Sequence, residues 1–88
     1  MSRLRPAPHV AVVEDAAIVY AATLPDGPIV VLDGGAAAIW VEACAGDRSS
    51  IADRVAEATG APVDEIRAAV HAFVDELVAR GLLAADPE

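Results

Sequence analysis

The sequence predicts an α+β fold in which a three-stranded antiparallel sheet is followed by three helices. Short runs of β-branched and other apolar residues fill the first third of the chain, and turn residues separate them. From Asp33 onward the apolar residues recur every three or four positions, which is typical of amphipathic helices. The chain therefore divides into a β-rich front and a helical back.

Length and charge limit what the protein can do. The 88 residues suffice for one domain, residues 1–88, with a single small core. Six basic against fourteen acidic residues give a formal charge of −8, which disfavours sequence-independent attraction to nucleic acid or anionic lipid. One cysteine cannot form an internal disulfide, and the N-terminal residues lack the apolar core of a signal peptide, so we expect a cytoplasmic protein.

Two hairpins account for the front of the chain. Pro6 and Pro8 keep the first residues extended and discourage a helix. The connections Glu14–Ala17 and Pro25–Pro28 are short enough for antiparallel hairpins. They join three predicted strands, which are His9–Val13, Ile18–Thr23 and Ile29–Leu32.

The third predicted strand, Ile29–Leu32, has no polar face. Because side chains alternate across a strand, Ile29 and Val31 point to one side, and Val30 and Leu32 point to the other. One pair can face the core, but leaving the other pair in water forgoes about 1.5–3 kcal/mol for each side chain. No fourth strand follows, so this strand lies at a sheet edge with unpaired backbone N–H and C=O groups.

Capping residues define the first two helices. Asp33 is the predicted N-cap, through its side chain, of a helix Gly34–Cys44. Ser50–Asp53 has the spacing of a capping box, so the second helix starts after Ser50 and stops at Gly60. The expected apolar faces are Ala36, Ile39, Trp40, Ala43 and Cys44 on the first helix and Ile51, Val55 and Ala58 on the second.

A longer third helix is expected over residues 62–80, with Pro62 in its first turn. It stops at Gly81, where a Schellman motif folds Leu82 onto Leu77. Its expected core stripe is Ile66, Val70, Phe73 and Leu77. One shoulder of this stripe is polar, with Glu65, Glu76 and Arg80. The other shoulder consists of Val63, Arg67, Val74 and Val78, with His71 beside them. It either forms the wall of a groove or packs against the sheet and the C-terminal tail.

No residue pattern predicts catalysis, a metal site or a cofactor. Cys44 shares a helix face with Trp40 near acidic residues, so we expect a packed thiol. His9 and His71 lie in no metal-ligand spacing, and Gly34–Gly35 belongs to no phosphate-binding glycine motif. We therefore expect neither enzyme activity nor a cofactor.

The order and separation of the motifs resemble those of the PqqD-like family. These proteins are RiPP recognition elements, which bind the leader peptides of ribosomally made peptides during their modification. The likeness covers nearly the whole chain and rests on the segments Leu4–Val10, Val31–Trp40, Cys44–Gly46, Ser50–Asp53, Val70–Leu77 and Gly81–Leu83.

The resemblance implies a winged helix-turn-helix-like domain in which the leader peptide adds to the third strand, in a groove walled by the third helix. Because Leu32 adjoins the first helix, we expect Ile29 and Val31 to face this groove. The implied partners are a precursor leader peptide and a modifying enzyme, either a radical SAM enzyme or a lasso-peptide leader protease, without nucleic acid or membrane. The implied peptide-binding residues are Ile29, Val30, Val31, Leu32, Val63, Arg67, Val70, His71, Val74 and Val78.

The sequence is also compatible with two other functions. A DNA-binding regulator can use the same winged-helix arrangement, although the second helix sets only Arg54 against Asp53 and Glu57, and the third helix is net acidic. A small structural subunit can form a homodimer through the exposed edge strand. Arg67 is either a solvated side chain or a partner for a leader carboxylate.

Overall fold

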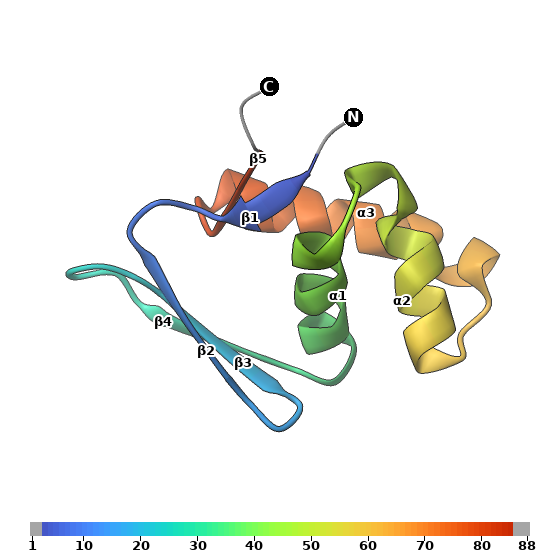
Figure 1. Ribbon diagram of the computed structural model, residues 1–88, viewed down its shortest axis with the longest axis horizontal. Helices are drawn as coiled ribbons and strands as arrows, with labels where there is room; N and C mark the ends of the chain where they lie inside the picture. Colours follow the sequence, from blue (N-terminus) through green and yellow to red (C-terminus); the bar gives the residue numbers. More distant parts are fainter. Residues whose placement is uncertain (1–2, 86–88) are drawn as a thin grey trace.

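The strands and helices follow one another in the predicted order, with one short strand added near each end (Figure 1). The computed structural model describes residues 3–85, so the first two and last three residues of the predicted 1–88 domain lie outside the described part. The predicted α+β class, a three-stranded antiparallel sheet followed by three helices, is confirmed. The elements are β1 (Leu4–Pro6), β2 (Val10–Asp15), β3 (Ile18–Thr23), β4 (Ile29–Asp33), α1 (Gly34–Ala45), the 3₁₀ turn η1 (Arg48–Ser50), α2 (Ile51–Thr59), α3 (Val63–Ala79) and β5 (Leu83–Ala85).

The three central strands pair antiparallel in the order β2-β3-β4, so β4 lies at an edge of the sheet as predicted. Tyr20 of β3 is opposite Val13 of β2 and Val31 of β4. β2 continues two residues beyond the predicted strand end, to Asp15. It does so because the turn to β3 needs only two residues, the first of which, Ala16, adopts a positive φ of 55°.

One face of this sheet packs against the helices. Val19, Ala21 and Leu32 point from that face into a core that they share with buried side chains of all three helices. Trp40 of α1 is 1% exposed and is among the largest fully buried side chains. Within residues 3–85, no helix has both the length and the apolar composition that a bilayer span requires.

A second, two-stranded sheet joins the two ends of the described chain. β1 pairs antiparallel with β5, with Leu4 opposite Ala85 and Pro6 opposite Leu83. Leu4 and Leu83 are both buried, so this pair closes one end of the core. The sequence did not predict it, because strands of three residues carry no periodic signal and β1 includes a proline.

The C-terminal helix signals are confirmed. Gly60 directly follows α2, and Gly81 follows Arg80, the C-cap of α3; the two glycines adopt left-handed φ values of 77° and 78°. The Leu82 N–H donates to the Leu77 carbonyl at 3.0 Å, and the Gly81 N–H donates to the Val78 carbonyl at 3.0 Å. These are the two hydrogen bonds of a Schellman motif.

The predicted N-cap hydrogen bonds are absent. Asp33 and Ser50 occupy the N-cap positions of α1 and α2, but neither side chain makes a capping hydrogen bond. Asp33 is held extended as the last residue of β4, and Gly34, with φ of 54°, turns the chain into the helix. At α2 the cap lies earlier, because the Asp47 carboxylate accepts the Ser49 N–H and begins η1.

Candidate functional site

β4 is the edge on which the predicted site centres. Ile29 and Val31 are 69% and 56% exposed, whereas Leu32 is 6% exposed and Val30 is half-buried. Because side chains alternate, Val30 and Leu32 point toward the helices, and Ile29 and Val31 point to the open face of the sheet. The place of Leu32 in the core is confirmed, but the expectation that Ile29 and Val31 face the third helix is wrong.

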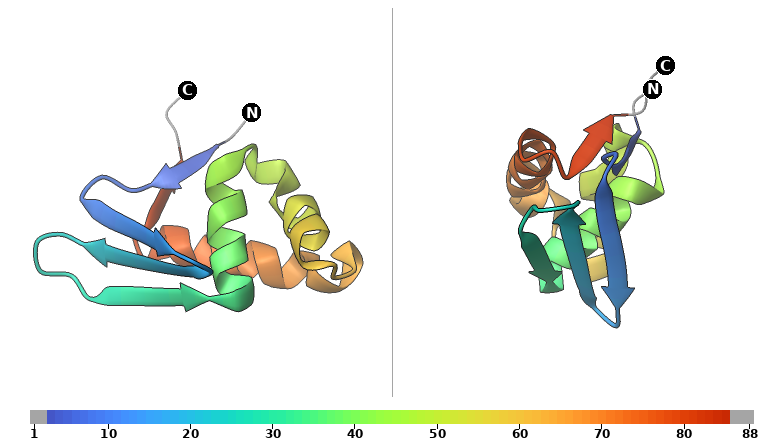
Figure 2. Two further views of the ribbon diagram at one scale, coloured as in Figure 1. Left: turned by 60° about the horizontal axis from the view of Figure 1, so that its bottom comes forward. Right: turned by 90° about the vertical axis from the view of Figure 1, so that its left-hand side faces the viewer.

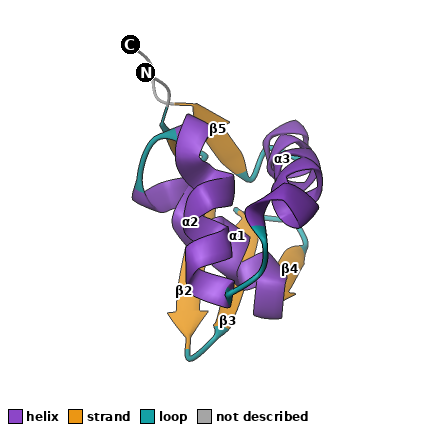
Figure 3. Cartoon of the chain, turned by 90° about the vertical axis from the view of Figure 1, so that its right-hand side faces the viewer, coloured by secondary structure: helices purple, strands orange, loops and turns teal. Residues whose placement is uncertain are grey.

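α3 and β4 lie toward one side of the molecule, and β2 lies toward the other, as the two end-on views agree (Figures 2 and 3). A cavity of about 310 Å³ opens between the beginning of β4 and the C-terminal end of α3. Val30 therefore shares a cavity with Arg80, the residue that caps α3. The full lining is Thr23, Pro28, Val30, Arg80 and Leu82.

The buried stripe of α3 is rotated relative to the predicted one. Ile66 and Phe73, which were expected in the core, are only half-buried. Val74, which was expected on a shoulder, is fully buried, so for this residue core packing is the correct interpretation. The α3 residues at 2% exposure are Val70, Val74 and Leu77, and the shoulder residues Val63 and Val78 are half-buried against the same core.

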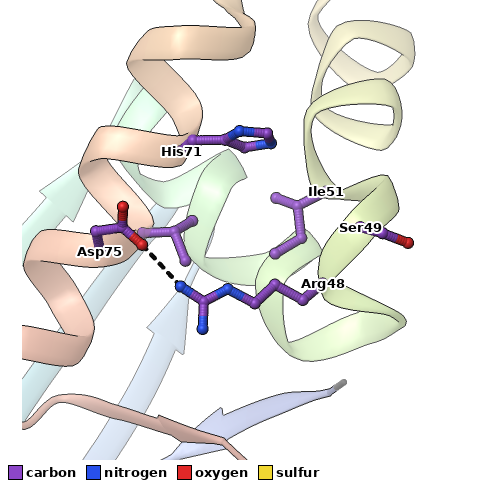
Figure 4. A pocket seen from close by; sticks show the side chains of 6 residues that line it. Arg48, Ser49, Ile51, His71 and Asp75 are labelled. Carbon is purple, nitrogen blue, oxygen red and sulfur yellow. Dashed lines mark hydrogen bonds and ion pairs between the residues drawn. The ribbon is translucent and has the colours of Figure 1, made fainter. Parts of the chain in front are cut away.

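Arg67 and His71 lie on the flank of α3 that faces η1 and α2. A guanidinium nitrogen of Arg67 lies 3.5 Å from Asp53 Oδ1 of α2. Further along this flank, Arg48 donates to Asp75 at 2.7 Å, and His71 points into a cavity of about 280 Å³ (Figure 4). The structure does not bring Arg67 and His71 to β4. The sequence could not show this, because periodicity indicates which residues share a flank of a helix but not which element that flank contacts.

The opposite flank of α3 is the one that lies toward β4. A helix turns by about 100° per residue, which places Ala69 and Phe73 on the same side of α3 as Arg80. Arg80 borders the cavity that it shares with Val30, and its guanidinium lies 3.4 Å from Glu76. Ala69 is exposed and Phe73 is half-buried. We predicted a polar shoulder here, with Glu76 and Arg80 next to the core residue Phe73. The small residue Ala69, one turn before Phe73, was a signal that this flank has an apolar part.

α1 carries one further apolar side chain that is partly accessible. Ala38 and Val41 of α1 line a cavity next to the β2–β3 turn. Ile39 projects from the opposite flank of the helix and is half-buried against the core. Val30, Ile39 and Phe73 thus belong to three different elements and are all partly accessible.

The titratable side chains form no metal-binding cluster within residues 3–85. In that range, no three His, Cys, Asp or Glu side chains lie close enough together to hold a metal ion. Cys44 packs against the core, and burial, followed by the negative charge of Glu14, raises the pKa of its thiol. A raised pKa lowers the thiolate fraction at neutral pH and makes Cys44 a poor nucleophile.

Comparison with known proteins identifies the family. A family model described as Coenzyme PQQ synthesis protein D (PqqD) matches residues 14–83, a segment that contains β4 and all three helices. No curated protein and no solved structure gives a significant match.

PqqD proteins are non-catalytic recognition proteins with a role in RiPP biosynthesis, where a precursor peptide and a biosynthetic enzyme are their kinds of partner. The match covers more than half of the chain and confirms the resemblance seen in the motifs. This chain therefore belongs to the PqqD family, the family of RiPP recognition elements.

Proposed function

We propose that residues 1–88 form a single recognition domain that binds the leader segment of a ribosomally synthesised precursor peptide and presents it to a modifying enzyme. The leader adds as a strand to the free edge of β4, on the side of the molecule where α3 lies. The observation that carries this proposal is the edge of β4, which pairs with no further strand among residues 3–85, beside the partly exposed apolar flank of α3.

The edge of β4 is suited to strand addition. It offers five residues in extended conformation, and every second residue directs its N–H and C=O away from β3. Proteins usually protect such an edge with lysine, proline or a bulge, and β4 has none of these between Ile29 and Asp33. A partner strand gains affinity from main-chain hydrogen bonds and specificity from pockets for alternate side chains.

The apolar residues beside the edge supply those pockets. A strand added to β4 continues the pleat of the sheet, so alternate leader side chains point to the face that carries the helices. There they meet Val30, Ile39 and Phe73, with Ala69 leaving room along α3. Of the peptide-binding residues that the family resemblance implies, those of β4 are also part of this proposed site. Arg67, His71 and Val78 are not, because the proposed site uses the opposite flank of α3.

The distribution of charge disfavours the alternative function, DNA binding. α3 carries four carboxylates and one guanidinium, so it lacks the basic surface that phosphate contacts need. Arg54 of α2 is directed inward, where its guanidinium donates to the backbone carbonyl of Glu42 at 2.6 Å and to that of Asp47 at 3.2 Å. Neither helix therefore presents a cationic face.

The experiment is a binding titration with the leader peptide of the precursor encoded beside this gene. Ala69→Arg places a bulky side chain between α3 and β4, and we expect it to raise the Kd by about tenfold or more. Ala68→Arg is the matched control, because Ala68 is also exposed on α3 but lies 100° away, on the solvent side. Equal affinities of the two variants contradict a groove between α3 and β4.

A further inference from the structure

The open face of the three-stranded sheet is a continuous apolar surface. Its central row runs across the three strands through Val13, Tyr20 and Val31, which are 60%, 36% and 56% exposed. The next row consists of Ala11, Ala22 and Ile29, and Ile29 is 69% exposed. A third row, Asp15, Ile18 and Asp33, ends the surface with two carboxylates. We call these nine residues the open face.

The sheet that carries the open face is strongly acidic. Residues 10–33 contain four carboxylates, and no lysine or arginine occurs between Arg5 and Arg48. The carboxylates are Glu14, Asp15, Asp26 and Asp33, and all four residues are exposed. A partner that covers the apolar centre therefore gains most when lysine or arginine side chains border its own apolar surface.

A second copy of the chain is a poor occupant. It would bring a further charge of −8 and another set of four carboxylates to the contact. Three strands about 4.8 Å apart and five residues long cover only about 250 Å². A stable interface buries about 800 Å² on each partner, so the open face has to be one part of a larger contact.

The proposed leader strand enlarges the surface that is available for such a contact. A leader paired with β4 becomes the next strand of the sheet, and its outward side chains extend the open face beyond Ile29 and Val31. A protein docked on the open face would then contact the sheet and the leader together.

We propose that the open face docks the modifying enzyme, through an apolar patch bordered by basic residues on that enzyme. This inference rests on the proposed function, since it assumes that a leader strand occupies β4. The recognition domain and its bound leader then form one composite surface for the enzyme, and leader binding strengthens enzyme binding.

The test uses the purified modifying enzyme encoded beside this gene and the chain loaded with its leader peptide. Val13→Lys removes an apolar contact and adds a positive charge, which the basic border of the partner repels. Val13 lies on β2, and β3 and β4 separate it from the proposed leader strand. We expect it to raise the Kd for the enzyme by about tenfold or more and to leave the Kd for the leader unchanged. Val41→Lys, an exposed valine on α1, is the matched control and should change neither Kd.

Three results overturn this inference. The first is an enzyme Kd that is equal for the wild type and Val13→Lys, and the second is a wild-type chain that binds the leader but not the enzyme. The third is a wild-type dimer in sedimentation equilibrium that Val13→Lys converts to a monomer, which assigns the open face to a second copy. Tyr20→Thr, a neutral change in the same row, replaces Val13→Lys if that variant fails to fold. Leader binding is measured separately: a wild-type chain that does not bind the leader contradicts the proposed function itself.

Discussion

Cys44 shows how the surroundings of a side chain oppose its ionisation. It lies near the end of α1, partly buried against the core, and Glu14 of β2 contributes a nearby negative charge. Both influences oppose formation of the thiolate and raise the pKa of the thiol, burial being the larger. The predicted packed thiol therefore agrees with its environment in the structure.

The raised pKa of Cys44 predicts a dependence of stability on pH. The folded state holds the thiol proton more tightly than the unfolded state does, so this contribution is complete below the ordinary thiol pKa of about 8.5 and is lost as pH rises through the raised value. The free energy of unfolding should thus fall more steeply with pH, from about pH 8 upward, in the wild type than in Cys44→Ala. Denaturant titrations at several pH values measure it, and parallel curves would show that the thiol pKa is not raised.

At the scale of elements, Arg54 joins α1, η1 and α2. Its guanidinium donates to the Glu42 and Asp47 carbonyls near the end of α1 and before η1, and it lies 3.4 Å from the Glu42 carboxylate. Gly46 passes directly beside it, since a Cβ at that position would lie 3.1 Å from a guanidinium nitrogen. The sequence marked Arg54 only as a basic residue on the second helix, because its carbonyl partners lie 7 and 12 residues away.

Arg54→Ala should therefore destabilise the domain by about 1–3 kcal/mol, because it leaves partly buried carbonyls of the α1–η1 segment without their donor. Arg67→Ala is the matched control, since its ion pair with Asp53 is exposed and such pairs contribute about 0–1 kcal/mol. Urea denaturation compares the two variants. Equal losses would mean that Arg54 does not hold the α1–η1–α2 junction.

The elements that the sequence predicts well are those with local signals. Gly60 and Gly81 end helices because they adopt left-handed φ values, and Ile18–Thr23 is a strand with the bounds that its β-branched residues predict. The rotation of α3 could not be predicted in the same way. Val74 and Phe73 are neighbours near the margins of one stripe, and only tertiary packing decides that Val74 is buried and Phe73 half-exposed.

At the scale of the whole molecule, the two proposed binding surfaces meet at β4. The free edge of the strand lies beside α3, and Ile29 and Val31 of the same strand belong to the open face of the sheet. The sequence predicted the edge because no strand follows Leu32 before the helices begin. It could not assign the strand faces, since both are apolar, nor could it place Arg67 and His71 beside α2 and η1 rather than β4.

The most direct test of the central claim, strand addition at β4, is an N-methyl scan of the leader peptide. N-methylation removes one backbone donor and leaves every side chain in place. If the leader pairs with β4, methylation at alternate residues should raise the Kd by about tenfold or more, and methylation at the residues between them should have little effect. A scan without this two-residue alternation, with equal losses or none along the segment, would contradict strand addition at β4.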